Sequence, residues 1–183
     1  MSKKAVVVLA EGFEELEAGA PVDVLRRAGV AVTVAGLGGM DVKSAHDMVF
    51  VADALVDGLS DDFDLIVLPG GMPGSKNLGE SPVVKALTEK MLAGGKLVSA
   101  ICAAPIFTLG AWGMLDNRKA TCYAGMEGMF PKTVTFSPET VVVDGKITTS
   151  RGPATAIPFA LSLAAQLQGQ AKADEVAAAM LVK

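Results

Sequence analysis

An apolar run ends in a cysteine at residues 96–105, which read KLVSAICAAP. The run up to Ile101 is typical of a buried strand, and residues 104–113 (APIFTLGAWG) predict a helix after it. Cys102 would then stand at a strand-to-helix turn, where a thiol has two interpretations. Free cysteine is often a small apolar core residue, whereas a thiol held at such a turn can serve as a nucleophile.

The same alternation of strands and helices extends along the chain on both sides of this stretch. Apolar runs predict strands at residues 5–10, 30–36 and 64–71, and helical patterns lie at residues 14–29 and 81–95. Ser81 and Pro82 suit the N-cap and first position of the second helix, and Gly29 suits the end of the first. Near-continuous Val, Ile and Leu strands separated by helices indicate a parallel sheet covered on both faces.

Two segments break this alternation. Residues 41–53 predict a small hairpin or excursion, and residues 133–150 predict two antiparallel strands that turn at Asp-Gly-Lys. Closing helices are expected at residues 153–169 and 172–182. Because no repeat, linker or low-complexity segment interrupts the chain, we expect one α/β sandwich domain over residues 1–183.

Composition excludes several classes of protein. A chain of 183 residues with 51% hydrophobic and 20% charged residues is not a disordered one. A net charge of −4 argues against nucleic acid or an anionic membrane as partner. The longest apolar stretch, residues 154–167, is too short to span a membrane and contains Pro158. The N-terminal apolar run meets acidic residues instead of a cleavage site, so we expect a cytoplasmic protein.

Three features are expected to converge at one edge of the sheet, because ligands bind outside the carboxyl ends of parallel strands. They are EGFEELE (residues 11–17), PGGMPG (residues 69–74) and Cys102. Gly70 and Gly71 would let backbone amides approach a ligand closely, although an ordinary strand-end turn explains them equally well.

A helix that begins near Ala103 would direct its free N–H groups and its dipole at the Cys102 sulfur. This arrangement favours thiolate over thiol and could also hold an oxyanion. Four glutamates crowd the first helical turn, at Glu11, Glu14, Glu15 and Glu17. Acidic residues favour helix N-termini, but the small residues after Glu17 suggest that its carboxyl is buried. A buried carboxyl would be protonated and could donate a hydrogen bond to a thiolate.

Other chemistry lacks support in the sequence. His46, the only histidine, lies in the 41–53 excursion, so it is expected to be a surface or hairpin residue. No His/Cys cluster has metal-ligand spacing, so no metal site is predicted. There is no G-x-G-x-x-G motif and no P-loop. Two cysteines do not make a disulfide framework, and Cys122 in KATCYAG is interpreted as structural.

Four motifs, in this order and spacing, resemble the ThiJ/PfpI superfamily, and within it the branch of Parkinsonism-associated deglycases. They are EELEAGAPVDVLRRAGVAVTVAG (14–36), DLIVLPGGMPGSKNL (64–78), SAICAAP (99–105) and TSRGPATAIPFAL (149–161). The resemblance implies a flavodoxin-like three-layer sandwich with a mostly parallel central sheet, helices on both faces and a small antiparallel excursion. It also implies a homodimer.

The resemblance further implies a site. Cys102 would be a nucleophilic, oxidation-sensitive cysteine, and Glu17 its protonated partner. Gly71 and Ala103 would supply oxyanion amides. Gly70 would shape the turn, and Gly70, Glu14 and Tyr123 are expected at the substrate.

The implied activity is conversion of methylglyoxal to lactate without glutathione or any cofactor, of the glyoxalase III or deglycase type. The alternative is a redox sensor or stress-protective chaperone whose Cys102 is oxidised to the sulfinate.

Two positions depart from the family pattern. The protease-like branch has histidine directly after the cysteine, where this chain has Ala103, so peptidase activity is not expected. The deglycase branch often has histidine where this chain has Tyr123. Tyrosine is a weaker base near pH 7, so slower dicarbonyl chemistry is expected.

Overall fold

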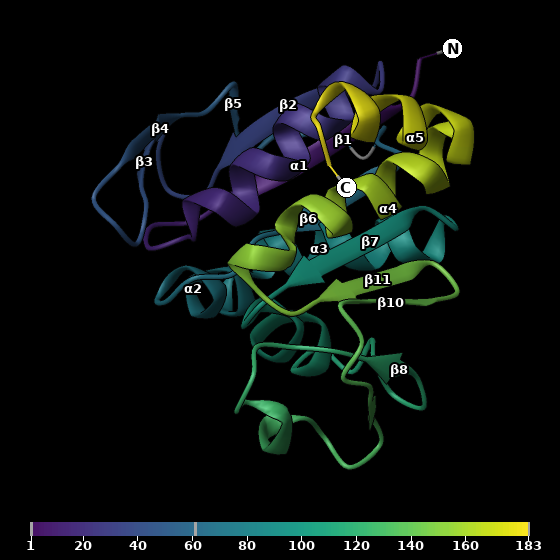
Figure 1. The fold of residues 1–183 in the computed structure, drawn as a ribbon. Coiled ribbons are helices and arrows are strands. Elements are labelled where there is room, and N and C mark those ends of the chain that lie inside the picture. The colour runs from purple at the N-terminus through teal and green to yellow at the C-terminus, as the bar shows by residue number, and fades with distance from the viewer. Residues whose placement is uncertain (1, 61, 183) are drawn as a thin grey trace.

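A seven-stranded sheet lies at the centre of the computed structural model, which describes residues 2–60 and 62–182 (Figure 1). The strands, in spatial order, are β10 (Val141–Asp144), β11 (Ile147–Ser150), β7 (Leu97–Ile101), β6 (Leu65–Leu68), β1 (Lys4–Leu9), β2 (Ala31–Gly36) and β5 (Ala54–Leu55). Every neighbouring pair is parallel except β10 and β11, which form an antiparallel hairpin at one edge. The predicted mostly parallel sheet is confirmed.

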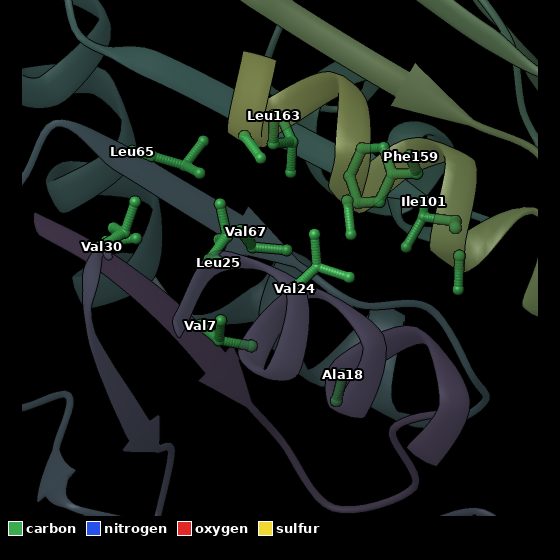
Figure 2. Packing of buried hydrophobic residues seen from close by; sticks show 14 of the residues in the cluster. Val7, Ala18, Val24, Leu25, Val30, Leu65, Val67, Ile101, Phe159 and Leu163 are labelled. Carbon is green, nitrogen blue, oxygen red and sulfur yellow. The ribbon is translucent and has the colours of Figure 1, made fainter. Parts of the chain in front are cut away.

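Helices cover both faces of the sheet, because alternate residues of its strands point to opposite sides. Ala5, Val7 and Leu9 of β1 belong to a core with α1 (Glu15–Arg27), α4 (Ala156–Gln168) and α5 (Gln170–Ala179). Figure 2 shows Val7 and Val67 in this core with Val24 and Leu25 of α1 and Phe159 and Leu163 of α4. The other two buried β1 residues, Val6 and Val8, pack in a second core with α2 (Gly74–Glu80) and α3 (Pro82–Ala93).

Helix ends follow the expected capping chemistry. The Ser81 hydroxyl accepts a hydrogen bond from the Val84 N–H at 3.3 Å, and Pro82 opens α3, as the sequence predicts. Gly29, just beyond α1, has φ +80°, a conformation that favours glycine. No helix in the described part of the chain is long and apolar enough to cross a membrane.

The smaller elements match the sequence in part. The expected excursion is the hairpin of β3 (Asp41–Lys43) and β4 (Val49–Val51). The pair β8 (Lys119–Ala120) and β9 (Thr135–Phe136) was not predicted, because strands of two residues show no periodicity. The remaining short turns are η2 (Glu127–Met129) and η3 (Pro153–Thr155), the latter immediately before α4.

The helix predicted over residues 104–113 is wrong in extent. It begins at residue 104 as predicted but ends at residue 110, and most of it is a π-helix, η1 (Ile106–Gly110), in which the Ala111 N–H donates to the Ile106 carbonyl at 3.0 Å. Thr108 donates its hydroxyl to the Ala104 carbonyl, which competes with the backbone ladder. Gly110 and Gly113 further weaken a regular helix here.

Candidate active site

Cys102 occupies a sharp turn at the carboxyl end of β7. Its φ of +66° is uncommon for a residue with a side chain, and such strain is concentrated at functional sites. The Cys102 N–H donates to the Ser150 carbonyl at 3.0 Å, and its own carbonyl accepts the Tyr123 N–H at 2.8 Å. Two neighbouring segments therefore hold the turn in place. The residue is 8% exposed, so its sulfur lies just below the surface.

Backbone amides from two loops point at the Cys102 sulfur. The Gly71 and Ala103 N–H groups both donate to it, and these hydrogen bonds favour the thiolate. Gly71 has φ +88°, and a Cβ there would lie 2.4 Å from the Glu14 nitrogen. A Cβ on Gly70 would lie 2.4 Å from Glu17 Oε2 and 2.5 Å from Cys102 Cβ. The two glycines therefore allow this loop to approach both side chains.

Glu17 lies behind the thiol on the first turn of α1 and is completely buried. Its Oε2 accepts the Gly70 N–H at 2.8 Å, and the Cys102 thiol faces the carboxyl, whose Oε1 has no other partner among the described residues. Burial raises the pKa of Glu17 to about 8, opposed by the Cys102 hydrogen bond and assisted by the negative charge of Glu14. At neutral pH this carboxyl therefore keeps its proton most of the time, as the sequence predicts for a buried glutamate.

The surroundings of the Cys102 thiol also raise its pKa, which opposes the thiolate that the sequence favours. Burial raises its pKa to about 12, and the negative charge of Glu17 adds to the effect. The hydrogen bonds from the Gly71 and Ala103 amides favour the thiolate, but they do not outweigh these two effects. Cys102 and Glu17 titrate as a pair, because each charge opposes the other.

Tyr123 forms the outer side of this site. A Cβ on Gly152 would lie 3.3 Å from the Tyr123 ring and 4.0 Å from Glu17 Oε1, so these three residues meet beside Cys102. Tyr123 is half exposed, whereas Glu14 is buried and its Oε2 accepts the Glu17 N–H at 2.8 Å.

The structure brings together all the residues that the sequence placed at the site: Cys102, Glu17, Gly71, Ala103, Gly70, Glu14 and Tyr123. Their chemical roles remain predictions. Sequence reasoning missed Ser150 and Gly152, which lie at the end of β11 and just beyond it, at the same edge of the sheet. The usable signal was a glycine two residues after the end of a predicted strand, in the motif TSRGPAT.

His46 and Cys122 take no part in the contacts that define this site. His46 is exposed in the turn between β3 and β4, as predicted, and its Nδ1 lies 2.9 Å from Glu15 Oε1. Among the described residues, Glu14, Glu15 and His46 offer ligand atoms within 4.8 Å of one another, a grouping that no sequence spacing indicated. Cys122 is fully buried, and burial raises the pKa of its thiol to about 11, which agrees with a structural cysteine.

Fold and site together define a class of protein. It is a flavodoxin-like α/β protein with a cysteine at a strained turn after a central strand, backed by a buried carboxyl and two loop amides. Residues 3–166 match the DJ-1/PfpI family, and the chain belongs to that family.

Similar proteins include members of known name. The chain is 46% identical to Protein dj-1beta of Drosophila melanogaster over 100% of this chain and 98% of that protein. The crystal structure of Drosophila melanogaster DJ-1beta superposes with a TM-score of 0.96 at 44% identity and full coverage of both chains. A Caenorhabditis elegans relative named glutathione-independent glyoxalase DJR-1.2 is 36% identical over 95% of this chain and 94% of that protein.

Proposed function

We propose that this protein is a cysteine-dependent enzyme that converts reactive dicarbonyls such as methylglyoxal to hydroxy acids, without glutathione or another cofactor. The observation that carries the proposal is the contact between the Cys102 thiol and the buried carboxyl of Glu17. The name of the Caenorhabditis elegans relative supports the same substrate class. Repair of glycated amines, the deglycase activity, would share the first step.

In the first step, the Cys102 sulfur bonds to the aldehyde carbon of methylglyoxal, and the thiol proton passes to the carbonyl oxygen. The product is a hemithioacetal. Negative charge that develops on sulfur or oxygen would meet the amides of Gly71 and Ala103, which already point at this position.

In the second step, Glu17 takes the proton from the former aldehyde carbon and returns it to the neighbouring carbon, while the hydroxyl proton passes from the first oxygen to the second. This isomerisation through an enediol turns the hemithioacetal into a thioester. With a pKa of about 8, Glu17 is partly ionised near neutral pH, and a general base works best when its pKa lies near the working pH. Water then hydrolyses the thioester, releases lactate and restores the thiol. The sum of the steps is methylglyoxal plus water to lactate.

Glu14 and Tyr123 would contact the substrate beside this pair. Tyr123 is half exposed at the edge of the site, against Gly152, and its hydroxyl can both donate and accept a hydrogen bond. The Glu14 carboxylate accepts a hydrogen bond from the Glu17 N–H. We expect Tyr123 to orient a carbonyl oxygen, and the absence of histidine at this position to make the reaction slow.

The test is methylglyoxal consumption by tag-free protein in the absence of glutathione. Wild type should form lactate, Cys102→Ala should not, and Cys122→Ala should retain the activity. If wild type is inactive while Cys102 alone becomes oxidised under peroxide, the redox sensor or chaperone is the better account.

We also propose that the protein is a homodimer. Four large apolar side chains on α1 and the β3–β4 hairpin are exposed: Leu16 (60%), Met48 (51%), Val49 (58%) and Val51 (72%). The backbone just before α1 is hydrogen-bonded to the hairpin, and exposed apolar side chains on neighbouring segments commonly mark an interface. A second copy of the chain would cover this apolar patch.

Two broader features remain predictions of the sequence. They are a single domain over residues 1–183 and a cytoplasmic location. Limited proteolysis without an internal cleavage product would support the first, and cell fractionation would test the second.

A further inference from the structure

Gly152 is a buried glycine at a position where the backbone does not require glycine. Its φ is 169°, which is extended backbone that any residue adopts, and a residue before a proline favours this region. The remaining restriction on this position is the space beside it. A Cβ at Gly152 would lie 3.3 Å from Cδ2 of the Tyr123 ring and 4.0 Å from Glu17 Oε1. The missing side chain therefore leaves an opening between an aromatic ring and a buried carboxyl.

The carboxyl oxygen at this opening is the one that is free to react. Oε2 of Glu17 accepts the Gly70 N–H at 2.8 Å. Oε1 is buried and, within residues 2–60 and 62–182, has no partner apart from the thiol that the carboxyl faces. A buried carboxyl oxygen without a partner is costly, and native proteins rarely leave one. Oε1 is therefore placed to meet a bound molecule.

Hydrogen bonds hold the backbone at Gly152 in place. Its N–H donates to the Thr155 hydroxyl at 3.0 Å, and its carbonyl accepts the Thr155 N–H at 2.8 Å. The Ser150 carbonyl accepts the Cys102 N–H at 3.0 Å, and the Ser150 hydroxyl oxygen lies 2.7 Å from that of Thr155. The turn at the thiol and the turn at Gly152 are therefore tied together, so an added side chain would fill the opening instead of displacing the backbone.

We propose that Gly152 sets substrate specificity, because its opening receives the group on the second carbonyl carbon of a dicarbonyl. This inference rests on the proposed function. Once sulfur is bonded to the first carbon, Glu17 must reach both carbons, and Oε1 is its oxygen without another partner. The second carbon then lies against Oε1, and its substituent extends over Gly152 toward the Tyr123 ring. A methyl group of the substrate takes the space that a Cβ would fill, so the substrate class is small 2-oxoaldehydes such as glyoxal and methylglyoxal.

The experiment compares wild type with Gly152→Ala, both full-length and tag-free, on glyoxal and methylglyoxal without glutathione. These substrates differ only by the methyl group on the second carbon. We expect the ratio of kcat/KM for methylglyoxal to that for glyoxal to fall about 10- to 200-fold in Gly152→Ala, the range for one extra carbon in a pocket. Gly128→Ala is the matched control, since Gly128 lies in the segment after Tyr123 and a Cβ there meets nothing within 4 Å. Its ratio should equal that of wild type.

A second variant widens the opening from its other side and does not depend on the folding of Gly152→Ala. Tyr123 is half exposed, so Tyr123→Ala should fold, and it removes the ring that faces Gly152. It should raise kcat/KM for phenylglyoxal relative to methylglyoxal at least about tenfold. Tyr123→Phe keeps the ring and should keep the wild-type preference, even though its hydroxyl is lost.

The outcomes separate this inference from the proposed function. A wild type inactive on both glyoxal and methylglyoxal would overturn the proposed function and the role of Gly152 with it. Turnover by wild type together with an unchanged ratio in a folded Gly152→Ala, or an unchanged preference in Tyr123→Ala, would overturn the role of Gly152 alone.

Discussion

The buried carboxyl of Glu17 and the thiol of Cys102 face one another at the carboxyl edge of the sheet, and the Gly70 amide fixes the carboxyl at 2.8 Å. The two side chains come from the first helix and the end of a central strand. When either group carries a negative charge, it raises the pKa of the other, so the two groups titrate as a coupled pair.

Replacing Glu17 by glutamine should separate reactivity of the thiol from turnover. Glutamine keeps the hydrogen bond to the Gly70 N–H but cannot move a proton. We expect methylglyoxal turnover to fall about 10²- to 10⁴-fold. The pKa of Cys102 should fall below the wild-type value of about 12, because the negative charge of Glu17 is removed. An absorbance titration of the thiolate, with turnover measured on the same samples, checks both. Unchanged turnover would reduce Glu17 to a structural residue.

Glu17 should also make wild-type stability depend on pH. Its pKa is about 8 in the folded protein, against an ordinary value of 4.5 for a solvated glutamate in the unfolded chain. Between these values the unfolded chain loses the proton and the folded chain keeps it, so stability falls as pH rises. The loss contributed by Glu17 is at most about 5 kcal/mol and is complete above pH 8. Denaturant melts from pH 5 to 9 should show this slope in wild type and a flatter one in Glu17→Gln. Equal slopes would mean that Glu17 ionises normally.

Gly71→Ala should destabilise the protein and abolish activity. A Cβ at Gly71 meets the Glu14 nitrogen at 2.4 Å, whereas one at Gly29, with a similar φ of +80°, meets nothing within 4 Å. Gly29→Ala therefore reports backbone strain alone. We expect Gly71→Ala to lower the free energy of unfolding by about 1–3 kcal/mol more than Gly29→Ala does, because the added methyl group overpacks the loop. Urea denaturation measures the difference in free energy of unfolding between the two variants. Equal losses would show that the loop at Gly71 adjusts to the added methyl group. Activity should survive only in the Gly29 variant.

Cys102 should be alkylated before Cys122. Both thiol pKa values are raised by burial, to about 12 and about 11, so acidity does not favour Cys102. Access of the reagent favours Cys102, because Cys122 is completely buried. In addition, the Gly71 and Ala103 amides stabilise negative charge on the Cys102 sulfur as it reacts. Peptide mass spectrometry after brief iodoacetamide treatment measures the ratio. Preferential labelling of Cys122 would contradict the assigned site.

Val51→Lys should shift the protein toward monomer. Val51 is the most exposed of the four apolar residues in the proposed dimer patch, so a charge there would be buried in the interface. Val143→Lys, on the edge strand β10, introduces the same charge outside the patch and should leave the mass unchanged. Light scattering at micromolar concentration distinguishes these outcomes, and a monomeric wild type would refute the dimer.

Much of the fold could be predicted because its signals are local. Long Val, Ile and Leu runs mark the central strands, and Ser81 with Pro82 marks the start of α3. Burial of Glu17 could be inferred from the small residues after it. The resemblance to a family then supplied residues that periodicity does not identify, such as Gly71 and Ala103.

What could not be predicted depends on contacts between distant segments. The contact between Glu15 and His46 joins a helix start to a hairpin turn, and nothing in either segment signals the other. The raised pKa of Cys102 depends on desolvation by several elements, which local sequence does not report. The π-helix after Cys102 rests on backbone hydrogen bonds such as that from the Ala111 N–H to the Ile106 carbonyl, for which the apolar pattern gives no signal.

The most direct test of the Cys102–Glu17 pair is rapid quenching of the reaction with methylglyoxal, followed by mass spectrometry of the Cys102 peptide. Wild type should form lactate and carry little adduct, because proton transfer follows addition. Glu17→Gln should accumulate one methylglyoxal on Cys102 and release almost no lactate. Lactate formation by Cys102→Ser at the wild-type rate, or no adduct on Cys102 in Glu17→Gln, would contradict the account.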